Sequence, residues 1–146
     1  MALFGGPRTT VLDDRVAAAL AKSYGDKGYE KYQLKMALKE QSAVLANLQP
    51  DEHIVFIGNG EGLGHAGIVL HMSAIVVTTQ RMLVIRGGKV RQALVREDVK
   101  KVSTGQASDG LYLLQVVGPR EIIGFEFKSI QRRDALMRAL GHEPVY

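Results

Sequence analysis

The sequence predicts an α+β fold that is mainly β: seven short antiparallel strands closed by a C-terminal helix and preceded by a helical hairpin. Three observations predict it. Apolar residues recur at helical spacing up to Pro50, where that pattern stops. From Glu52 onward, short alternating apolar segments are separated by glycine-containing turns, as in antiparallel sheets. A last amphipathic segment follows Ser129 and ends at Gly141.

Length and composition limit the chain to one sizeable core. It has 146 residues, 46% hydrophobic and 23% charged, so we expect one globular domain with an appendage. The absence of cysteine excludes disulfides, thiolate zinc sites and cysteine nucleophiles, and it agrees with a reducing interior. No apolar run reaches the roughly 18 residues of a transmembrane segment, and the first ten residues lack the apolar core of a signal peptide. We therefore expect a cytoplasmic protein.

The chain is expected to divide into three segments. Residues 1–9 contain Gly5, Gly6 and Pro7, which favour a flexible terminus. Residues 10–47 are expected to form the helical hairpin, and residues 48–146 the β domain.

The hairpin is predicted to contain two helices. The first runs from Thr10, which can cap it, to Gly25. The second spans Tyr29–Leu48 and is rich in strong helix formers. Its charged residues are expected mostly on the solvent side: Lys31, Lys35, Lys39 and Glu40. The apolar stripe is rich in alanine and lacks tryptophan, which favours packing on the chain itself or on a partner over insertion into a membrane surface.

Seven strands and a helix are predicted after Pro50. The strands are Glu52–Ile57, Ala66–Thr79, Met82–Ile85, Lys89–Val95, Val99–Ser103, Leu111–Val117 and Glu121–Phe127. Gly87 and Gly88 suit a tight primed turn, and Ser129 is expected to cap the helix Ile130–Leu140. The positions expected to face inward are Ile54, Phe56, Ile68, Leu70, Val76, Leu83, Ile85, Leu94, Val99, Leu111, Leu113, Val116, Ile123, Phe125, Leu136 and Leu140.

A glycine-rich run, with glycine at positions 58, 60, 62 and 64, superficially resembles a nucleotide-binding loop. It lacks the Gly-Lys-Ser/Thr ending of a P-loop, Leu63 occupies the place of the last glycine of GxGxxG, and no helix is predicted after it. The run is predicted to be a mobile hairpin loop instead.

Three short motifs occur in a consistent order. LQPDE at residues 48–52 precedes the first strand, VTTQRML at residues 77–83 is similar to an "LTDKRL" turn, and residues 94–99 are similar to an "IPLSDI" step. Over residues 48–141 the chain thereby resembles the bacterial pleckstrin-homology-like (PH-like) domains, in particular the short, stand-alone YokE-like type. The resemblance implies a bent sandwich or partly open barrel plugged by the C-terminal helix, and a bacterial or phage origin.

The resemblance also implies a ligand site, because ligands of PH-like domains commonly sit among the loops after strands one, three and six. The ligand-binding candidates that it gathers are Arg86, Lys89, Arg91, Arg120 and His65. The four cations suit an anion-binding mouth. The first loop lacks the lysines and arginines that eukaryotic phosphoinositide readers concentrate there, so specific phosphoinositide recognition is not expected. Thr78 and Arg81 are expected to be structural, with Arg81 tying its turn to nearby carbonyls.

The segment Arg81–Lys101 holds seven cations against Glu97 and Asp98. The segment is either a solvated strand face or a surface that binds nucleic acid. The second interpretation is the weaker one, because only 6% of the residues are aromatic and could stack on bases. The four histidines do not have the spacing of metal ligands, and the order of the residues does not indicate a Ser-His-Asp triad. We therefore expect no catalysis, metal or cofactor.

The sequence thus predicts a non-enzymatic binding or scaffolding module. Its partner is expected to be a protein or further copies of itself, because small sheets with open edges readily add a strand and some PH-like relatives assemble into rings. The alternative is an anionic ligand, an acidic lipid headgroup or nucleic acid, bound by the basic loop mouth and strand face.

Overall fold

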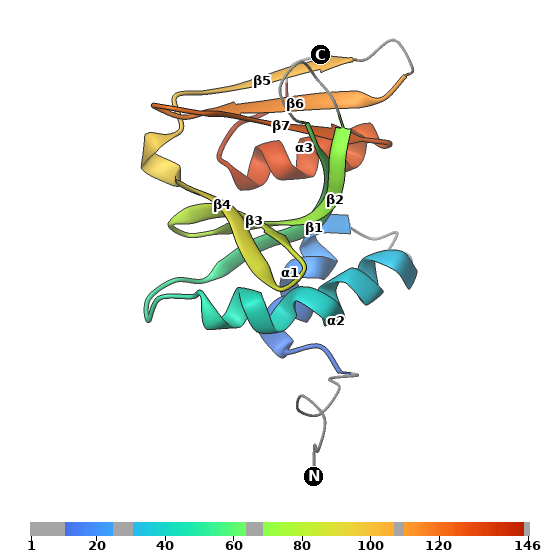
Figure 1. Cartoon of the computed structure of the whole chain (residues 1–146), viewed down its shortest axis with the longest axis vertical. Helices are drawn as coiled ribbons and strands as arrows, with labels where there is room; N and C mark the ends of the chain where they lie inside the picture. The colour runs from blue at the N-terminus through green and yellow to red at the C-terminus, as the bar shows by residue number, and fades with distance from the viewer. Residues whose placement is uncertain (1–10, 25–30, 64–68, 107–109, 145–146) are drawn as a thin grey trace.

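The computed structural model describes residues 11–24, 31–63, 69–106 and 110–144 (Figure 1). The elements run in the order α1 (Asp14–Tyr24), α2 (Lys31–Ala46), β1 (Ile54–Leu63), β2 (Val69–Thr78), β3 (Arg81–Arg86), β4 (Lys89–Val95), the 3₁₀ turn η3 (Arg96–Asp98), β5 (Lys101–Gln106), β6 (Tyr112–Val117), β7 (Ile122–Phe127) and α3 (Ile130–Ala139).

The seven strands form one antiparallel sheet in the order β4-β3-β2-β1-β7-β6-β5. β1 joins its two parts, because it pairs with β2 along its length and with β7 only through Glu61–Leu63. The sheet bends at this junction, so β1–β4 and β5–β7 lie as two layers with α3 between them (Figure 1). This architecture confirms the predicted fold class, a PH-like bent sandwich with a C-terminal helix.

The inner core lies between the two layers and α3. Phe125, Leu114 and Leu136 are fully buried there, one from each of β7, β6 and α3. The other buried members of this cluster are Phe56, Ile75, Val77, Met82, Val84, Leu94, Val116, Ile123, Phe127, Met137 and Leu140.

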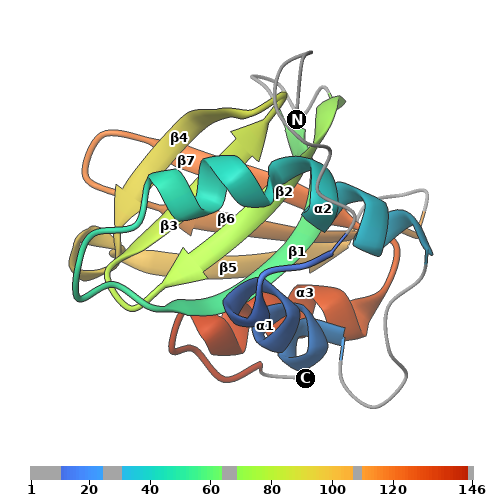
Figure 2. The ribbon, with the colours of Figure 1, turned by 90° about the horizontal axis from the view of Figure 1, so that it is seen from below.

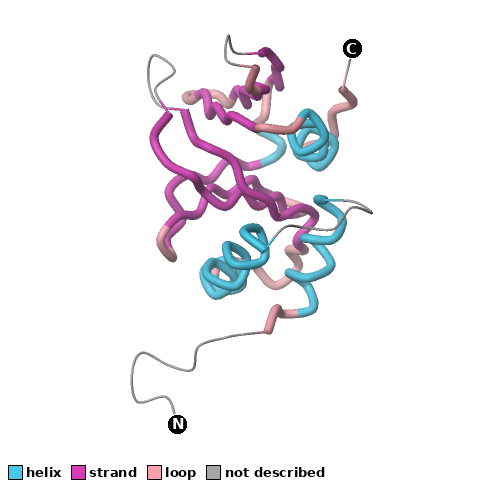
Figure 3. The backbone as a smooth tube through the Cα atoms, turned by 90° about the vertical axis from the view of Figure 1, so that its right-hand side faces the viewer, coloured by secondary structure: helices cyan, strands magenta, loops and turns pink. Residues whose placement is uncertain are grey.

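A second core lies on the outer face of β1–β4, where α1 and α2 cover the sheet (Figures 2 and 3). Its buried members are Val16, Ala19, Leu20, Ala37, Val44, Ile57, Ala74, Val76, Leu83 and Ile85. The sequence placed Val76, Leu83 and Ile85 inside the sandwich, which is wrong: they face the helices. β2 and β3 are buried on both faces, which explains their uninterrupted apolar runs.

The two predicted helix caps have different outcomes. α1 begins at Asp14, and Asp13 caps it by accepting a 2.9 Å hydrogen bond from the Arg15 amide, so the helix start predicted at Thr10 is wrong. α3 is capped as predicted, since Ser129 accepts from the Arg132 amide and Gly141 ends the helix with φ of 87°. Residues 1–9, predicted to be flexible, lie outside the described residues.

The glycine-rich run is a strand as far as Leu63 rather than a loop. A Cβ atom added at Gly60 would lie 2.8 Å from Ile75 Cδ1 and 3.1 Å from a Phe127 ring carbon. A larger residue here would require the Ile75 side chain or the Phe127 ring to move, so Gly60 allows close packing across the sheet rather than a turn.

Candidate functional site

A cluster of cations surrounds the hairpin between β3 and β4. Arg86 ends β3, Lys89 begins β4, and Arg91 follows two residues later. The turn residues Gly87 and Gly88 have φ of 61° and 77°, as the predicted primed turn requires. Arg91 Nε donates to the Arg86 carbonyl oxygen at 3.2 Å, which holds the two residues together. Lys89 and Arg91 are exposed and Arg86 is half-buried. We call these three residues the basic hairpin cluster.

Helix α2 lies against this hairpin and brings further charge. The Glu40 side chain is buried, and its two carboxylate oxygens accept from the Gly88 amide at 3.2 and 3.3 Å. The sequence placed Glu40 on the solvent side, and this is wrong. Lys35 and Lys39 of the same helix are exposed beside it. No carboxylate among the described residues pairs with either lysine or with the basic hairpin cluster.

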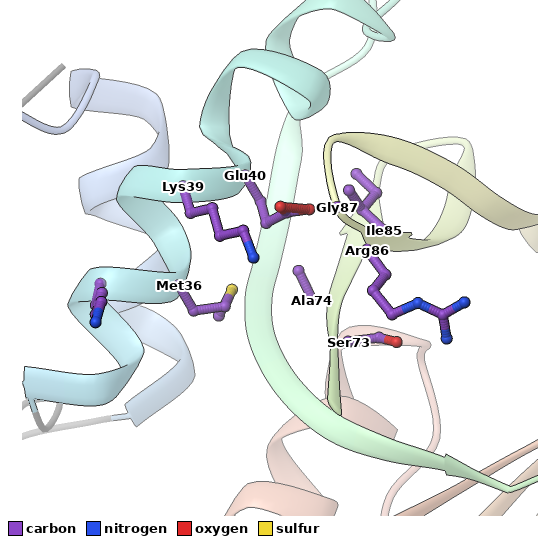
Figure 4. Close-up of a pocket in the computed structure, with 9 residues that line it drawn as sticks. Met36, Lys39, Glu40, Ser73, Ala74, Ile85, Arg86 and Gly87 are labelled. Atoms are coloured by element: carbon purple, nitrogen blue, oxygen red, sulfur yellow. The ribbon is translucent and has the colours of Figure 1, made fainter. Parts of the chain in front are cut away.

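A pocket of about 210 Å³ lies between α2 and the hairpin. Its lining residues are Lys35, Met36, Lys39, Glu40, Ser73, Ala74, Ile85, Arg86 and Gly87. In Figure 4, Met36 and Lys39 point from α2 towards Ala74 of β2, and the Glu40 carboxylate points towards Gly87. We call this the α2–hairpin pocket.

The structure does not gather all predicted ligand residues into one mouth. A Cβ atom at Gly118 would lie 2.8 Å from Leu94 Cδ1, so the β6–β7 turn that carries Arg120 lies beside the C-terminal end of β4. Lys89 lies at the other end of β4, about 16 Å away along the strand. Arg120 is therefore separate from the basic hairpin cluster. His65 lies outside the described residues.

The turn between β2 and β3 carries a buried ion pair. Arg81 Nη2 lies 2.6 Å from Glu52 Oε1, and Arg81 Nε donates to Glu52 Oε2 at 2.9 Å. Thr78 Oγ1 donates to the same carboxylate, and Arg81 also donates to the Asn47 carbonyl oxygen. The hydrogen bonds from Arg81 lower the pKa of Glu52 from its ordinary 4.5 to about 2. Thr78 and Arg81 thus join the turn to the segment between α2 and β1.

Several other arginines have internal partners. Arg96 Nη1 donates to the Thr78 carbonyl oxygen at 3.2 Å. Arg133 is buried, lies 3.1 Å from the Asp134 carboxylate and packs over the Tyr112 ring at 5.6 Å from its centroid. Because these arginines have partners within the fold, fewer positive side chains are available to bind an external ligand than the sequence indicates.

The two edges of the sheet differ. β4 pairs with β3 through an irregular register, in which Val84 pairs with Gln92 and Ile85 with Val90, leaving Arg91 as a bulge. β5 pairs with β6 through six consecutive residue pairs without a shift. None of the six β5 residues is buried.

The part of the chain that the structure describes contains no group of three or more histidine, aspartate or glutamate side chains placed to hold a metal ion. None of its helices is long and apolar enough to cross a membrane.

Comparisons with solved structures give a structural likeness at low sequence identity. No family model matches the sequence, and no curated protein matches it. The chain is similar to a solved structure described as "Autoinhibited Vav1", with 11% sequence identity and a TM-score of 0.45. The similarity covers 76% of this chain and 22% of that one, so this chain spans about a fifth of the other's length. The strand order and the position of α3 define the fold independently of this likeness.

Proposed function

We propose that this protein is a non-enzymatic binding module that adds an extended strand along the exposed edge of β5. The added strand belongs to a protein partner or to a second copy of this chain. The observation that carries the proposal is the contrast between the two sheet edges.

The β4 edge has the features that proteins use to prevent strand addition. A bulge at Arg91 interrupts its register, and Lys89 places a charge at its start. The β5 edge has a regular register and, after Lys101, carries the neutral residues Val102 to Gln106. An edge strand of this kind can offer backbone amides and carbonyls to an incoming strand, and main-chain hydrogen bonds then supply affinity. Within β5, the Gly105 carbonyl oxygen also accepts from Arg133 Nη1 at 3.5 Å.

The N-terminal helices are less suited to assembly than the sequence indicates. Val16 and Leu20 of α1 and Ala37 and Val44 of α2 are each 0% exposed, because they pack on the sheet of their own chain. Their apolar stripe is therefore occupied, which leaves the sheet edge as the better candidate for a partner.

The proposal is tested by adding charge to each edge in turn. Thr104 of β5 and Gln92 of β4 are both exposed, so Thr104→Lys and Gln92→Lys form a matched pair. Light scattering over a range of concentrations measures self-association, and selection from a displayed peptide library supplies ligands. We expect Thr104→Lys to weaken self-association or peptide binding at least tenfold, because a lysine on a sheet edge opposes pairing. Gln92→Lys should leave both unchanged.

Hydrogen exchange identifies the surface used. Binding should slow exchange of the amides in residues 101–106. A wild-type chain that stays monomeric and selects no peptide sensitive to Thr104→Lys would contradict strand addition at β5, as would protection confined to β4.

A second candidate function is supported by the basic hairpin cluster. Lys89 and Arg91 are exposed, and neither has a carboxylate partner among the described residues. We propose, as the alternative, that they bind phosphates of a polyanionic surface, since guanidinium and ammonium groups satisfy phosphate oxygens.

This candidate predicts binding that weakens steeply with salt. Single-stranded DNA and vesicles containing phosphatidylserine provide the two sources of phosphate. The double variant Lys89→Gln/Arg91→Gln should lose binding to whichever source is bound, while Lys101→Gln on β5 should retain it. Equal binding by both variants would contradict a role for the cluster.

A further inference from the structure

The α2–hairpin pocket combines an apolar wall with cations. Met36 of α2 is half-buried and supplies accessible apolar surface, while Ala74 of β2 and Ile85 of β3 are 1% and 0% exposed and form the floor of the pocket beneath it. Lys35, Lys39 and Arg86 are its cations, against the single carboxylate of Glu40, so the lining carries a net formal charge of +2.

The one carboxylate in the pocket is already engaged. Glu40 is 3% exposed and accepts from the Gly88 amide, which directs its charge to the hairpin backbone (Figure 4). Lys39 points into the pocket and has neither an ion pair nor a hydrogen bond to another described residue (Figure 4). No anion among the described residues therefore pairs with the Lys39 ammonium group, which lies at the edge of an apolar surface.

The size of the pocket limits its ligand. Its volume of about 210 Å³ exceeds the roughly 150 Å³ of an apolar cavity that admits benzene. The space therefore fits a single ring or a short acyl chain, with the head group at the opening.

We propose that the α2–hairpin pocket binds a small monocarboxylic acid with an apolar body, such as an arylacetate or a short-chain acyl carboxylate. The body packs on Met36 and the aliphatic stem of Lys39, above Ala74 and Ile85, and the carboxylate accepts from the Lys39 ammonium group. A charge-assisted hydrogen bond supplies orientation while the apolar wall supplies contact area, the usual division of roles in small-molecule sites. This site does not depend on strand addition at β5.

The test is a titration of the full chain with phenylacetate and hexanoate, each beside its neutral counterpart, 2-phenylethanol and 1-hexanol. Calorimetry measures affinity. We expect each acid to bind about tenfold more tightly than its alcohol. Lys39→Gln should lower the affinity for the acid to that for the alcohol, whereas Lys101→Gln on β5 should not change it. Both lysines are exposed, so neither variant is expected to affect folding.

Methyl NMR locates the ligand. The methyl signals of Met36, Ala74 and Ile85 should shift on titration, while those of Leu114 and Val116 in the inner core should not. Equal affinity for acid and alcohol, an unchanged affinity in Lys39→Gln, or shifts that leave the pocket methyls unmoved would each overturn the proposal.

Discussion

At the scale of single residues, the ion pair between Glu52 and Arg81 makes the sharpest prediction. The Glu52 side chain is 0% exposed and Arg81 is 20% exposed, so removing the carboxylate leaves a largely desolvated guanidinium without its partner. We expect Glu52→Gln to lower the free energy of unfolding by about 3 kcal/mol at pH 7. Urea titration measures this, and Asp51→Asn, at an exposed neighbour, should change it by less than about 0.5 kcal/mol.

The same pair predicts a pH dependence with a defined sign. The pKa of Glu52 is about 2 in the folded chain against an ordinary 4.5, so the unfolded chain binds its proton first as pH falls. The stabilisation is complete above about pH 5 and is lost as pH falls through 4.5 towards 2. The difference in unfolding free energy between wild type and Glu52→Gln should therefore shrink over this range. A difference that stays constant from pH 7 to pH 3 would contradict the ion pair.

Gly60 predicts a steric effect. Its added Cβ atom would lie 2.8 Å from Ile75 Cδ1, whereas a Cβ at Gly105, also in a strand, would meet nothing closer than 3.8 Å. We expect Gly60→Ala to destabilise the fold by about 1–3 kcal/mol through overpacking, and Gly105→Ala to cost less than about 0.5 kcal/mol. Thermal unfolding of the two variants compares them directly, and equal shifts would show that close packing at Gly60 is unimportant.

Residue roles with local causes were predictable from the sequence. The turn at Gly87 and Gly88 and the cap at Ser129 follow from backbone preference alone, and both are confirmed. The burial of Glu40 depends on its hydrogen bond to Gly88, which is 48 positions away along the chain. The composition of the helix alone therefore predicted the wrong side for Glu40. A signal was present, however: Gln33, Ala37, Glu40 and Val44 recur at spacings of three and four, which puts Glu40 on the buried stripe.

At the scale of elements, the strands show that periodicity predicts where a strand lies better than it predicts which of its faces packs on the inner core. β4 has the predicted boundaries Lys89–Val95, because glycines and a change of pattern delimit it. In β3 every residue from Met82 to Ile85 is buried, so alternation is absent and the sequence gives no sign of which side is inner. The helices that cover the second face lie outside the resemblance to PH-like domains, and nothing local to β3 indicates them.

These helices predict the behaviour of a truncated chain. Removing residues 1–47 would expose Ile57, Val76, Leu83 and Ile85, each 0% exposed in the full chain. We expect a chain that begins at Leu48 to aggregate or to bind a hydrophobic dye, because an exposed apolar sheet face favours association. Light scattering and dye fluorescence measure this beside the full chain. A soluble, dye-negative monomer would show that the second core is dispensable.

At the scale of the whole molecule, the two cores share β2 and β3, which couples their stability. Ile75 and Val77 face the inner core while Ala74 and Val76 face the helices, so neither core can open without exposing one side of the same strand. The sequence predicted a boundary between residues 10–47 and 48–146, but shared strands lead us to expect one cooperative unfolding transition.

Two core substitutions test this coupling. Leu20 of α1 and Leu136 of α3 are each 0% exposed, and they belong to the second core and the inner core, respectively. Each substitution by alanine should cost about 2–5 kcal/mol. If the molecule unfolds as one unit, Leu20→Ala should lower the exchange protection of the Val44 and Phe125 amides by the same amount, and so should Leu136→Ala. Loss of protection at Val44 alone in Leu20→Ala would instead mean that α1 and α2 detach first, leaving the sandwich as an independent domain.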